Sequence, residues 1–479
     1  MRVLFSLCFL LVFGSQVFAQ DPGVWNSDAT TRLDELLEKM HDNHQFNGAV
    51  LLAEDGKTVY EKSLGVANIN DGRKLTPASS FRLASVSKQF TAMGIMLLQE
   101  AGKLNYDDDI RKHVPELPYE GITIRHLLNH TGGLADYMAL FEKKWNPEKP
   151  EPDRATAFNS DLVELFAKHK PDIGFKPGER FEYSNTGYVL LAVIIERVSE
   201  QPIKQFLNDR IFVPLEMNHT SAFSPGDDFV LPQRVYGFSW TVDGKSHEDN
   251  DWNFLNGMIG DGGIYASVRD LLKWDQALYG EKLIKQATLE QAFTTGKTND
   301  GEETGYGFGW AIESANGKPV RVVHGGGWVG FRTSIERNLR DKQTTIVLTN
   351  HSSNHLGVIL AAVEKIKKGE SVKPPEPGTF GDRDEDVEDA VELSAETLEA
   401  YMGQFELTPD FVITITRSEK QLFGQATGQP QFQLRSLTET KFKVIGVDAQ
   451  LTFNKSANGR IDSVTLHQGG FDQKADRIK

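Results

Sequence analysis

The stretch 81-FRLASVSKQFTAMGIMLLQEAGKL-104 decides how the rest of this chain is interpreted. Its apolar residues recur at three- and four-residue spacing, which predicts a helix, and they are Val86, Phe90, Met93, Leu97 and Leu98. Gly102 follows the last of them, where a helix end favours glycine. We therefore expect a helix that Ser85 opens and that ends before Gly102.

Ser85 and Lys88 lie three residues apart, on the same face of this helix and close to its positive end. A serine hydroxyl becomes a strong nucleophile when a base takes its proton, and a lysine can do this only when uncharged. Free N–H groups at the helix start can stabilise an oxyanion. No other Ser-x-x-Lys occurs in the sequence. The same pattern also fits an ordinary amphipathic helix with Ser85 as N-cap and Lys88 in solvent.

Length and composition set the class of protein. A chain of 479 residues favours two domains, and 39% hydrophobic with 25% charged residues is typical of a soluble globular protein. The net charge of −15 argues against nucleic acid or an anionic membrane surface as a partner.

Residues 1–19 have the pattern of a secretory signal peptide, with Arg2, an apolar run over 3–13 and a small-residue end at Ala19. No later segment is apolar for the roughly 18 residues that a membrane span needs. The single cysteine, Cys8, lies in this segment, so the exported protein would contain no disulfide. We expect a periplasmic or secreted protein.

The pattern over 20–368 predicts an α/β domain, an antiparallel sheet flanked by helices. The expected elements are helices near 28–41, 122–134 and 160–169, helices from Ser184 and Ser267 onward, a hairpin around Asp55-Gly56, three strands at 305–314, 318–338 and 343–352, and a last helix at 354–367.

Composition changes after this domain. Residues 369–392 are rich in proline and acidic residues, which predicts an extended linker. Residues 393–479 hold short alternating runs separated by turn residues, which predict a small antiparallel barrel or sandwich.

Two further motifs resemble cofactor or metal sites, but neither has the surrounding residues that such a site needs. Gly325-x-Gly327-x-x-Gly330 matches the dinucleotide fingerprint, but the residues that follow are strand-like and that site needs a helix there. We interpret these glycines instead as positions where a substrate can lie close to the backbone of a strand edge. His126 and His130 are four residues apart, and we expect packing or hydrogen-bonding roles because no third metal ligand is evident. We expect no metal and no organic cofactor.

A second polar pair stands at the start of the helix after Ser184: Tyr183 and Asn185 form the one Tyr-x-Asn of the sequence. Acyl transfer on serine needs a nucleophile, a base, a proton donor and an oxyanion hole. In this interpretation Ser85 is the nucleophile, Lys88 and Tyr183 share the proton, and Asn185 orients Lys88 or substrate. A buried aromatic role is the alternative for Tyr183.

The motifs SVSK, YSN and HGG, with LLNHTGGL and GGIYASVRDLLKW around them, resemble the serine β-lactamase-like, penicillin-binding-protein-like hydrolases. This family includes class C β-lactamases, D-Ala-D-Ala carboxypeptidases, D-aminopeptidases and esterases. The resemblance covers roughly 45–368 and implies an all-helical subdomain beside the α/β part, with the site between them. It also implies an acyl-enzyme on Ser85 and an oxyanion hole from the N–H groups of Ser85 and Gly327. The tail resembles a lipocalin-like domain.

The third motif departs from the usual family pattern, since His324 stands where a lysine commonly attracts the substrate carboxylate. With His324, Gly325, Gly326 and Gly327 as substrate-binding residues, we expect an exported peptidase of the D-aminopeptidase or carboxypeptidase kind, or an esterase. Its substrates would be small peptides, amides or esters, with cell-wall fragments among the candidates. The alternatives are a β-lactamase, or a non-hydrolytic sensor that binds peptidoglycan fragments through the C-terminal barrel.

Overall fold

The computed structural model describes residues 25–478 except 151–152, 227–230, 232, 241–245, 354, 376–392, 409–410, 419–420, 428–431, 445–448, 457–458 and 469–470. The signal segment and most of the expected linker lie outside the described residues. The described residues from 393 onward belong to a compact unit that is separate from the unit containing the six-stranded sheet.

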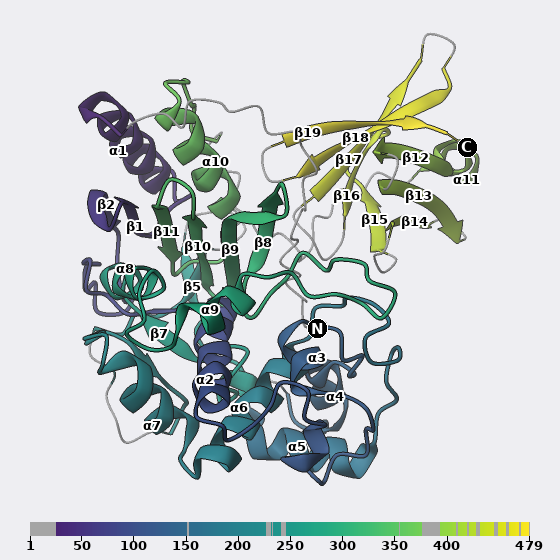
Figure 1. Ribbon diagram of the computed structural model, residues 1–479. Coiled ribbons are helices and arrows are strands. Elements are labelled where there is room, and N and C mark those ends of the chain that lie inside the picture. The colour runs from purple at the N-terminus through teal and green to yellow at the C-terminus, as the bar shows by residue number, and fades with distance from the viewer. Residues whose placement is uncertain are drawn as a thin grey trace. The chain divides into compact units, whose positions relative to one another are not determined.

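A six-stranded sheet forms the frame of the larger unit, in the order β2-β1-β11-β10-β9-β8 (Figure 1). Every neighbouring pair of strands is antiparallel, as the sequence predicts. The strands are β1 (Gly48–Glu54), β2 (Lys57–Leu64), β8 (Ala311–Ala315), β9 (Lys318–Trp328), β10 (Phe331–Asn338) and β11 (Gln343–Thr349).

Helices cover both faces of this sheet. Residues 48–53 of β1 are all buried, which is the pattern of a strand covered on both sides. Helix α1 (Ser27–Asp42) packs on β2, and α8 (Val268–Ala277) packs on β1 and β11. Figure 1 shows α1 and α8 on opposite sides of the sheet.

The prediction of three strands after Gly305 is wrong, because 318–338 is two strands joined by a tight turn. Trp328 pairs with Phe331, so Val329 and Gly330 form the turn of a β9–β10 hairpin. Val329 has a φ of 43°, a conformation that β-branched residues rarely adopt. The turn residues are Val-Gly and not the Asn-Gly or Asp-Gly pair by which hairpins are predicted from a sequence, so this turn was not predicted.

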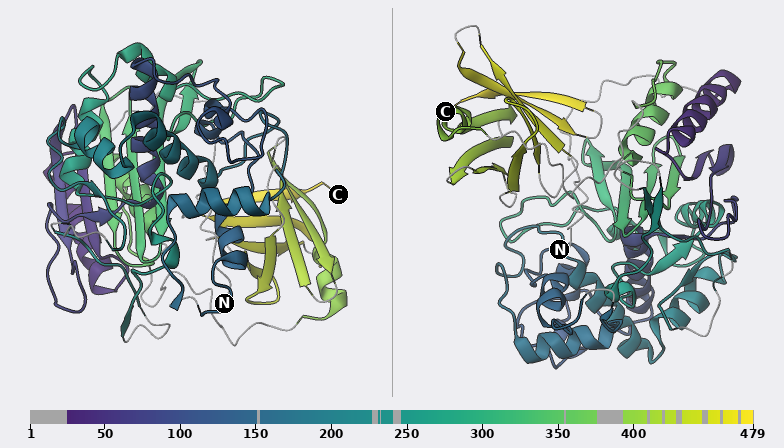
Figure 2. Two further views of the ribbon diagram at one scale, coloured as in Figure 1. Left: turned by 90° about the horizontal axis from the view of Figure 1, so that it is seen from below. Right: turned by 180° about the vertical axis from the view of Figure 1, so that it is seen from behind.

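The helices between these strands gather on one side of the sheet (Figure 2). Helix α6 is central among them, because it contacts α2, α3, α5 and α7. The helices are α2 (Lys88–Glu100), α3 (Ile124–Leu128), α4 (Tyr137–Lys144), α5 (Asn159–His169), α6 (Asn185–Ser199), α7 (Ile203–Leu207) and α9 (Gln286–Ala292), with α10 (Leu356–Lys367) after the last strand. Short strands complete the unit: β3 (Phe81–Arg82), β4 (Ser221–Ala222) and β7 (Ile264–Ala266) in one sheet, β5 (Phe238–Trp240) and β6 (His247–Asp249) in another.

The C-terminal unit is a closed barrel of eight antiparallel strands, which decides between the expected barrel and sandwich. Apolar side chains fill its interior, among them Phe405, Phe442 and Phe453, and Tyr401 of α11 (Ala395–Tyr401) packs against the last two. The strands are β12 (Gly403–Thr408), β13 (Phe411–Ser418), β14 (Gln421–Ala426), β15 (Phe432–Ser436), β16 (Lys441–Val444), β17 (Ala449–Lys455), β18 (Ile461–Gln468) and β19 (Phe471–Arg477).

Candidate active site

Ser85 lies in a short 3₁₀ turn, η1 (Ala84–Ser87), between strand β3 and helix α2. The α-helix therefore begins at Lys88, one turn later than the apolar pattern predicts. Ala84 has a φ of 48°, in the left-handed region that costs a non-glycine residue free energy. This backbone bend precedes Ser85 directly, and Ser85 remains partly exposed where its neighbours in η1 are buried.

Lys88 is completely buried, with 0% of its surface exposed, so the alternative of a solvated lysine does not hold. Its Nζ lies 3.1 Å from Ser85 Oγ, 2.8 Å from Asn185 Oδ1 and 3.0 Å from the main-chain oxygen of Asp261. A neutral amine has two N–H bonds and one lone pair. In the neutral form, N–H groups donated to Asn185 and Asp261 would leave the lone pair for the hydroxyl of Ser85.

Tyr183 and Asn185 reach this amine from the start of α6, whose N-cap is Ser184. The ring centre of Tyr183 lies 4.9 Å from Lys88 Nζ. The ring of His130 lies 4.4 Å from that of Tyr183, and its Nδ1 accepts a hydrogen bond from the main-chain N–H of Ser184 at 3.0 Å. The structure thus brings four of the predicted site residues together: Ser85, Lys88, Tyr183 and Asn185.

The histidines around this cluster are held in the neutral form. Burial, and then the charge of Lys88, lower the pKa of His130 well below its ordinary value. Burial likewise lowers the pKa of His324 to about 3, with Lys88 again contributing. Since Gly325 O can only accept, His324 Nδ1 donates to it at 2.6 Å, and Nε2 accepts from the Tyr306 hydroxyl at 2.8 Å. His324 is therefore a buried, neutral side chain with both ring nitrogens engaged.

The glycines of β9 lie against Ser85. A Cβ atom on Gly326 would stand 2.3 Å from Leu83 O and 3.0 Å from Ser85 N, so only glycine fits this approach. The pairing of β9 with β8 ends at Val323, whereas its pairing with β10 continues to Trp328. Among the described strands, none pairs with the other edge of 324–328, which places main-chain N–H and C=O groups beside Ser85.

Sequence reasoning missed Asp261, Tyr137 and Tyr306. Asp261 accepts from Lys88 through its main-chain oxygen, and its carboxylate accepts from the Tyr137 hydroxyl at 3.0 Å. Burial raises the pKa of the Asp261 carboxyl, against the opposing effect of Lys88. Every residue has a main-chain oxygen, so the sequence around Asp261 gives no signal that this oxygen accepts a hydrogen bond from Lys88.

The predicted packing and hydrogen-bonding roles fit the two histidines of 122–134. His126 caps α3, where its Nδ1 accepts from Thr123 N at 3.2 Å, and His130 packs beneath the cluster described above. In the part of the chain that the structure describes, no group of three or more His, Cys, Asp or Glu residues is arranged to hold a metal ion. No helix among the described residues is both long and apolar enough to cross a bilayer.

Comparison with known proteins agrees with this fold. The family profile described as "Beta-lactamase" matches residues 33–365, and one described as a domain of unknown function (DUF3471) matches 387–478. The chain therefore belongs to the beta-lactamase family, together with its penicillin-binding-protein-like members. Penicillin-binding protein 4* of Bacillus subtilis (strain 168) is 36% identical over 462 residues, which cover 93% of this chain and 98% of that protein.

Solved structures show the same architecture. The penicillin-binding protein from Bacillus halodurans is 26% identical, with a TM-score of 0.58 over 69% of this chain and 98% of its own. The D-amino acid amidase from Ochrobactrum anthropi SV3, solved with L-phenylalanine amide, is 22% identical, with a TM-score of 0.59 over 71% of this chain and 98% of its own. The latter similarity is one of fold.

Proposed function

We propose that this protein is an exported serine hydrolase that cleaves small amides, peptides or esters through an acyl-enzyme on Ser85. One observation carries the proposal: the fully buried Nζ of Lys88 lies 3.1 Å from Ser85 Oγ, with two further acceptors for its N–H groups. Family membership supports it, because serine acyl transfer and hydrolysis are the chemistry of this family. Export rests on residues 1–19 of the sequence alone.

In the acylation step, Ser85 Oγ attacks the carbonyl carbon of the substrate while Lys88 takes the hydroxyl proton. The new C–O bond turns the carbonyl oxygen into an oxyanion, which the N–H groups of Ser85 and Gly327 stabilise. Lys88 is then an ammonium, and its three hydrogen bonds to Ser85, Asn185 and Asp261 match the three donors of that form.

Collapse of this intermediate breaks the bond to the leaving group. The proton passes from Lys88 by way of Tyr183 to the leaving nitrogen or oxygen, and the acyl group stays on Ser85 as an ester. In the second half a water molecule attacks this ester, the same groups take its proton and return it to Ser85, and a carboxylic acid leaves. Every proton is thus returned, so no cofactor is consumed.

The surroundings of His324 favour peptidase or esterase activity over β-lactam hydrolysis. A neutral, buried imidazole offers no fixed positive charge to a substrate carboxylate, unlike the lysine usual at this place. The likeness in fold to a D-amino acid amidase supports amides of D-amino acids as the first class to try. A non-hydrolytic sensor gains little support, since apolar side chains fill the interior of the described barrel.

The test is turnover of a panel of D- and L-amino acid amides, p-nitrophenyl esters and a chromogenic cephalosporin by the full chain. We expect amide or ester hydrolysis that falls by at least about 10⁴-fold in Ser85→Ala. Ser87→Ala, at the next serine of η1, is a control for folding because its Oγ is a buried acceptor for Ile264 N. Equal turnover by Ser85→Ala and wild type would refute the proposal.

A further inference from the structure

Trp328 extends from the same face of β9 as the glycine that meets the nucleophile. Side chains two residues apart in a strand share a face, so Trp328 and Gly326 both project toward the side on which Ser85 lies. The two residues are separated by roughly 7 Å along the strand, at about 3.3 Å per residue. Trp328 is thus the first side chain beyond the glycines on the nucleophile's side.

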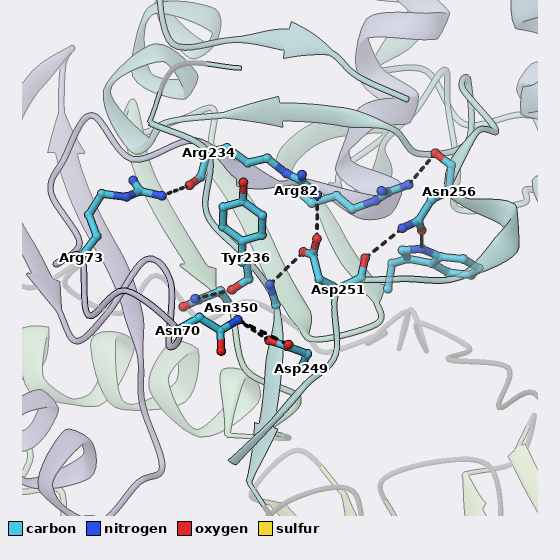
Figure 3. Close-up of polar contacts among 11 residues, drawn as sticks. Asn70, Arg73, Arg82, Arg234, Tyr236, Asp249, Asp251, Asn256 and Asn350 are labelled. Atoms are coloured by element: carbon cyan, nitrogen blue, oxygen red, sulfur yellow. Dashed lines mark hydrogen bonds and ion pairs between the residues drawn. The ribbon is translucent and has the colours of Figure 1, made fainter. Parts of the chain in front are cut away.

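A chain of hydrogen bonds fixes the indole of Trp328. Its Nε1 donates to Asn256 Oδ1 at 2.7 Å, and Asn256 Nδ2 donates to the main-chain oxygen of Asp251 at 2.8 Å. The carboxylate of Asp251 in turn accepts from Arg234 Nη2 at 2.6 Å and from Gly237 N at 2.8 Å. Figure 3 shows Asn256 between Asp251 and Arg82, which lies three residues before Ser85. Asn256 is therefore held from two sides.

The polar atom of this indole is satisfied inside the protein, and the residue as a whole is partly exposed. Its exposed surface is therefore carbon. Two further exposed aromatic side chains belong to segments that adjoin Asn256: Trp252, 42% exposed, and Phe158, 41% exposed. Phe158 bridges to Gly257, where a Cβ atom would lie 2.8 Å from the phenyl ring. Exposed apolar surface of this kind is typical of places where a protein binds a ligand.

The position of Tyr183 decides which part of the substrate meets Trp328. Tyr183 passes the proton to the leaving group in the proposed mechanism, and its ring lies 6.2 Å from that of His324. The leaving group thus lies toward the His324 end of the free edge of β9. The acyl part extends the other way along the edge, toward Trp328.

We propose that Trp328, positioned by Asn256, forms an apolar wall for the acyl side of the substrate and selects acyl groups with a large aromatic or aliphatic side chain. This inference rests on the proposed function for the direction of the substrate. Trp328 contacts substrate, and Asn256 acts through Trp328 as a positioning residue.

The experiment compares D-phenylalanine p-nitroanilide with D-alanine p-nitroanilide. We expect wild type to favour the phenylalanine substrate in kcat/KM, and Trp328→Ala to reduce this ratio about tenfold or more, with less than about threefold change on the alanine substrate. Trp328→Phe should keep most of the preference. Val213→Ala, which removes an exposed apolar side chain elsewhere, is the matched control. Equal losses on both substrates in Trp328→Ala would overturn the proposal.

A double-mutant cycle separates positioning from general stability. Asn256→Ala should lower the preference in wild type but have little effect in Trp328→Phe, whose phenyl ring has no N–H to lose. The same loss in both backgrounds would contradict the positioning role. Binding is measured independently by titrating Ser85→Ala with 3-phenylpropionamide and acetamide. If Trp328 forms the proposed wall, Ser85→Ala binds 3-phenylpropionamide more tightly than acetamide, and Ser85→Ala/Trp328→Ala loses this difference. This result is expected even if the enzyme shows no turnover and the proposed function is wrong. Equal binding of 3-phenylpropionamide by Ser85→Ala and Ser85→Ala/Trp328→Ala would overturn the proposal.

Discussion

Lys88 Nζ and Asn185 Oδ1 lie 2.8 Å apart, and this contact joins the start of α2 to the first residue of α6. In the proposed mechanism, this contact takes up one N–H of Lys88 and so helps to leave the lone pair of the amine for Ser85. We predict that Asn185→Leu lowers kcat by about 10²-fold or more, because an N–H of Lys88 then competes for the hydroxyl. In Asn185→Asp the carboxylate favours the ammonium form of Lys88, so the pH–rate profile should move to higher pH. Superimposable profiles for Asn185→Asp and wild type would contradict this role.

Gly326→Ala tests the close approach of β9 to Ser85. The added Cβ would lie 2.3 Å from Leu83 O, a main-chain atom that cannot swing away. We expect the strand or η1 to shift and kcat/KM to fall by about 10²-fold, with the fold retained in circular dichroism. Gly280→Ala is the control, since its nearest neighbour would be 4.0 Å away. Full activity in Gly326→Ala would show that this approach is unimportant.

The acid sensitivity of the fold follows from its buried histidines. Burial lowers the pKa of His324 and of His351 to about 3, and that of His355 to about 4, whereas unfolding restores values near 6.5. Between these limits the unfolded chain binds more protons than the folded chain. The contribution of the neutral histidines to the unfolding free energy is therefore complete above pH 6.5 and is lost as the pH falls toward their folded-state pKa values.

Each such histidine contributes a slope of about 1.4 kcal/mol per pH unit. We predict that His324→Gln flattens the dependence of the unfolding free energy on pH between 4 and 6 by about one proton. Exposed His169, at the end of α5, provides the control His169→Gln. Chemical denaturation at several pH values measures both, and an unchanged slope in His324→Gln would contradict the assignment.

Much of the fold was accessible from the sequence because its elements carry local signals. Helix α1, the β1–β2 hairpin and α6 with its N-cap Ser184 lie where periodicity and capping predict them. A small antiparallel barrel or sandwich was predicted from the alternating runs, although β12 and β19 were not among the runs that suggested it. The β9–β10 turn was missed because Val329 occupies a position that usually demands glycine or asparagine.

Part of the candidate site was likewise predictable from the sequence, and part was not. Ser85, Lys88, Tyr183 and Asn185 stand in short motifs whose spacing survives in the fold, and the structure brings them together. The contacts of Asp261, Tyr137, Tyr306 and Asn256 join segments far apart in the chain. Such contacts depend on tertiary packing, which single-sequence patterns do not contain.

The strained turn itself gives a prediction. Val329→Asn would place Asn-Gly in the β9–β10 hairpin, and asparagine tolerates the left-handed region far better than valine. We expect the unfolding free energy to rise by about 1 kcal/mol. Val320→Asn, in strand β9 outside the turn, should give no such gain. A lower melting temperature for Val329→Asn than for wild type would count against the strain.

A buried ion pair ties helix α8 to the sheet. Arg337 of β10 donates through Nε to the Asp275 carboxylate and through Nη2 to its main-chain oxygen, and both side chains are fully buried. We predict that Asp275→Leu alone costs about 3–5 kcal/mol of unfolding free energy, because it leaves an uncompensated charge. Adding Arg337→Met should recover part of the loss. A double variant no more stable than Asp275→Leu alone would refute this account.

The central claim is that the hydroxyl of Ser85, activated by a buried amine, becomes covalently acylated. Peptide mass spectrometry after brief incubation with a fluorophosphonate, and separately with a p-nitrophenyl ester at low pH, tests it most directly. We predict one adduct, on the peptide that contains Ser85, in wild type, and none in Ser85→Ala or Lys88→Met. An adduct on another residue, or undiminished labelling of Ser85→Ala, would contradict the claim.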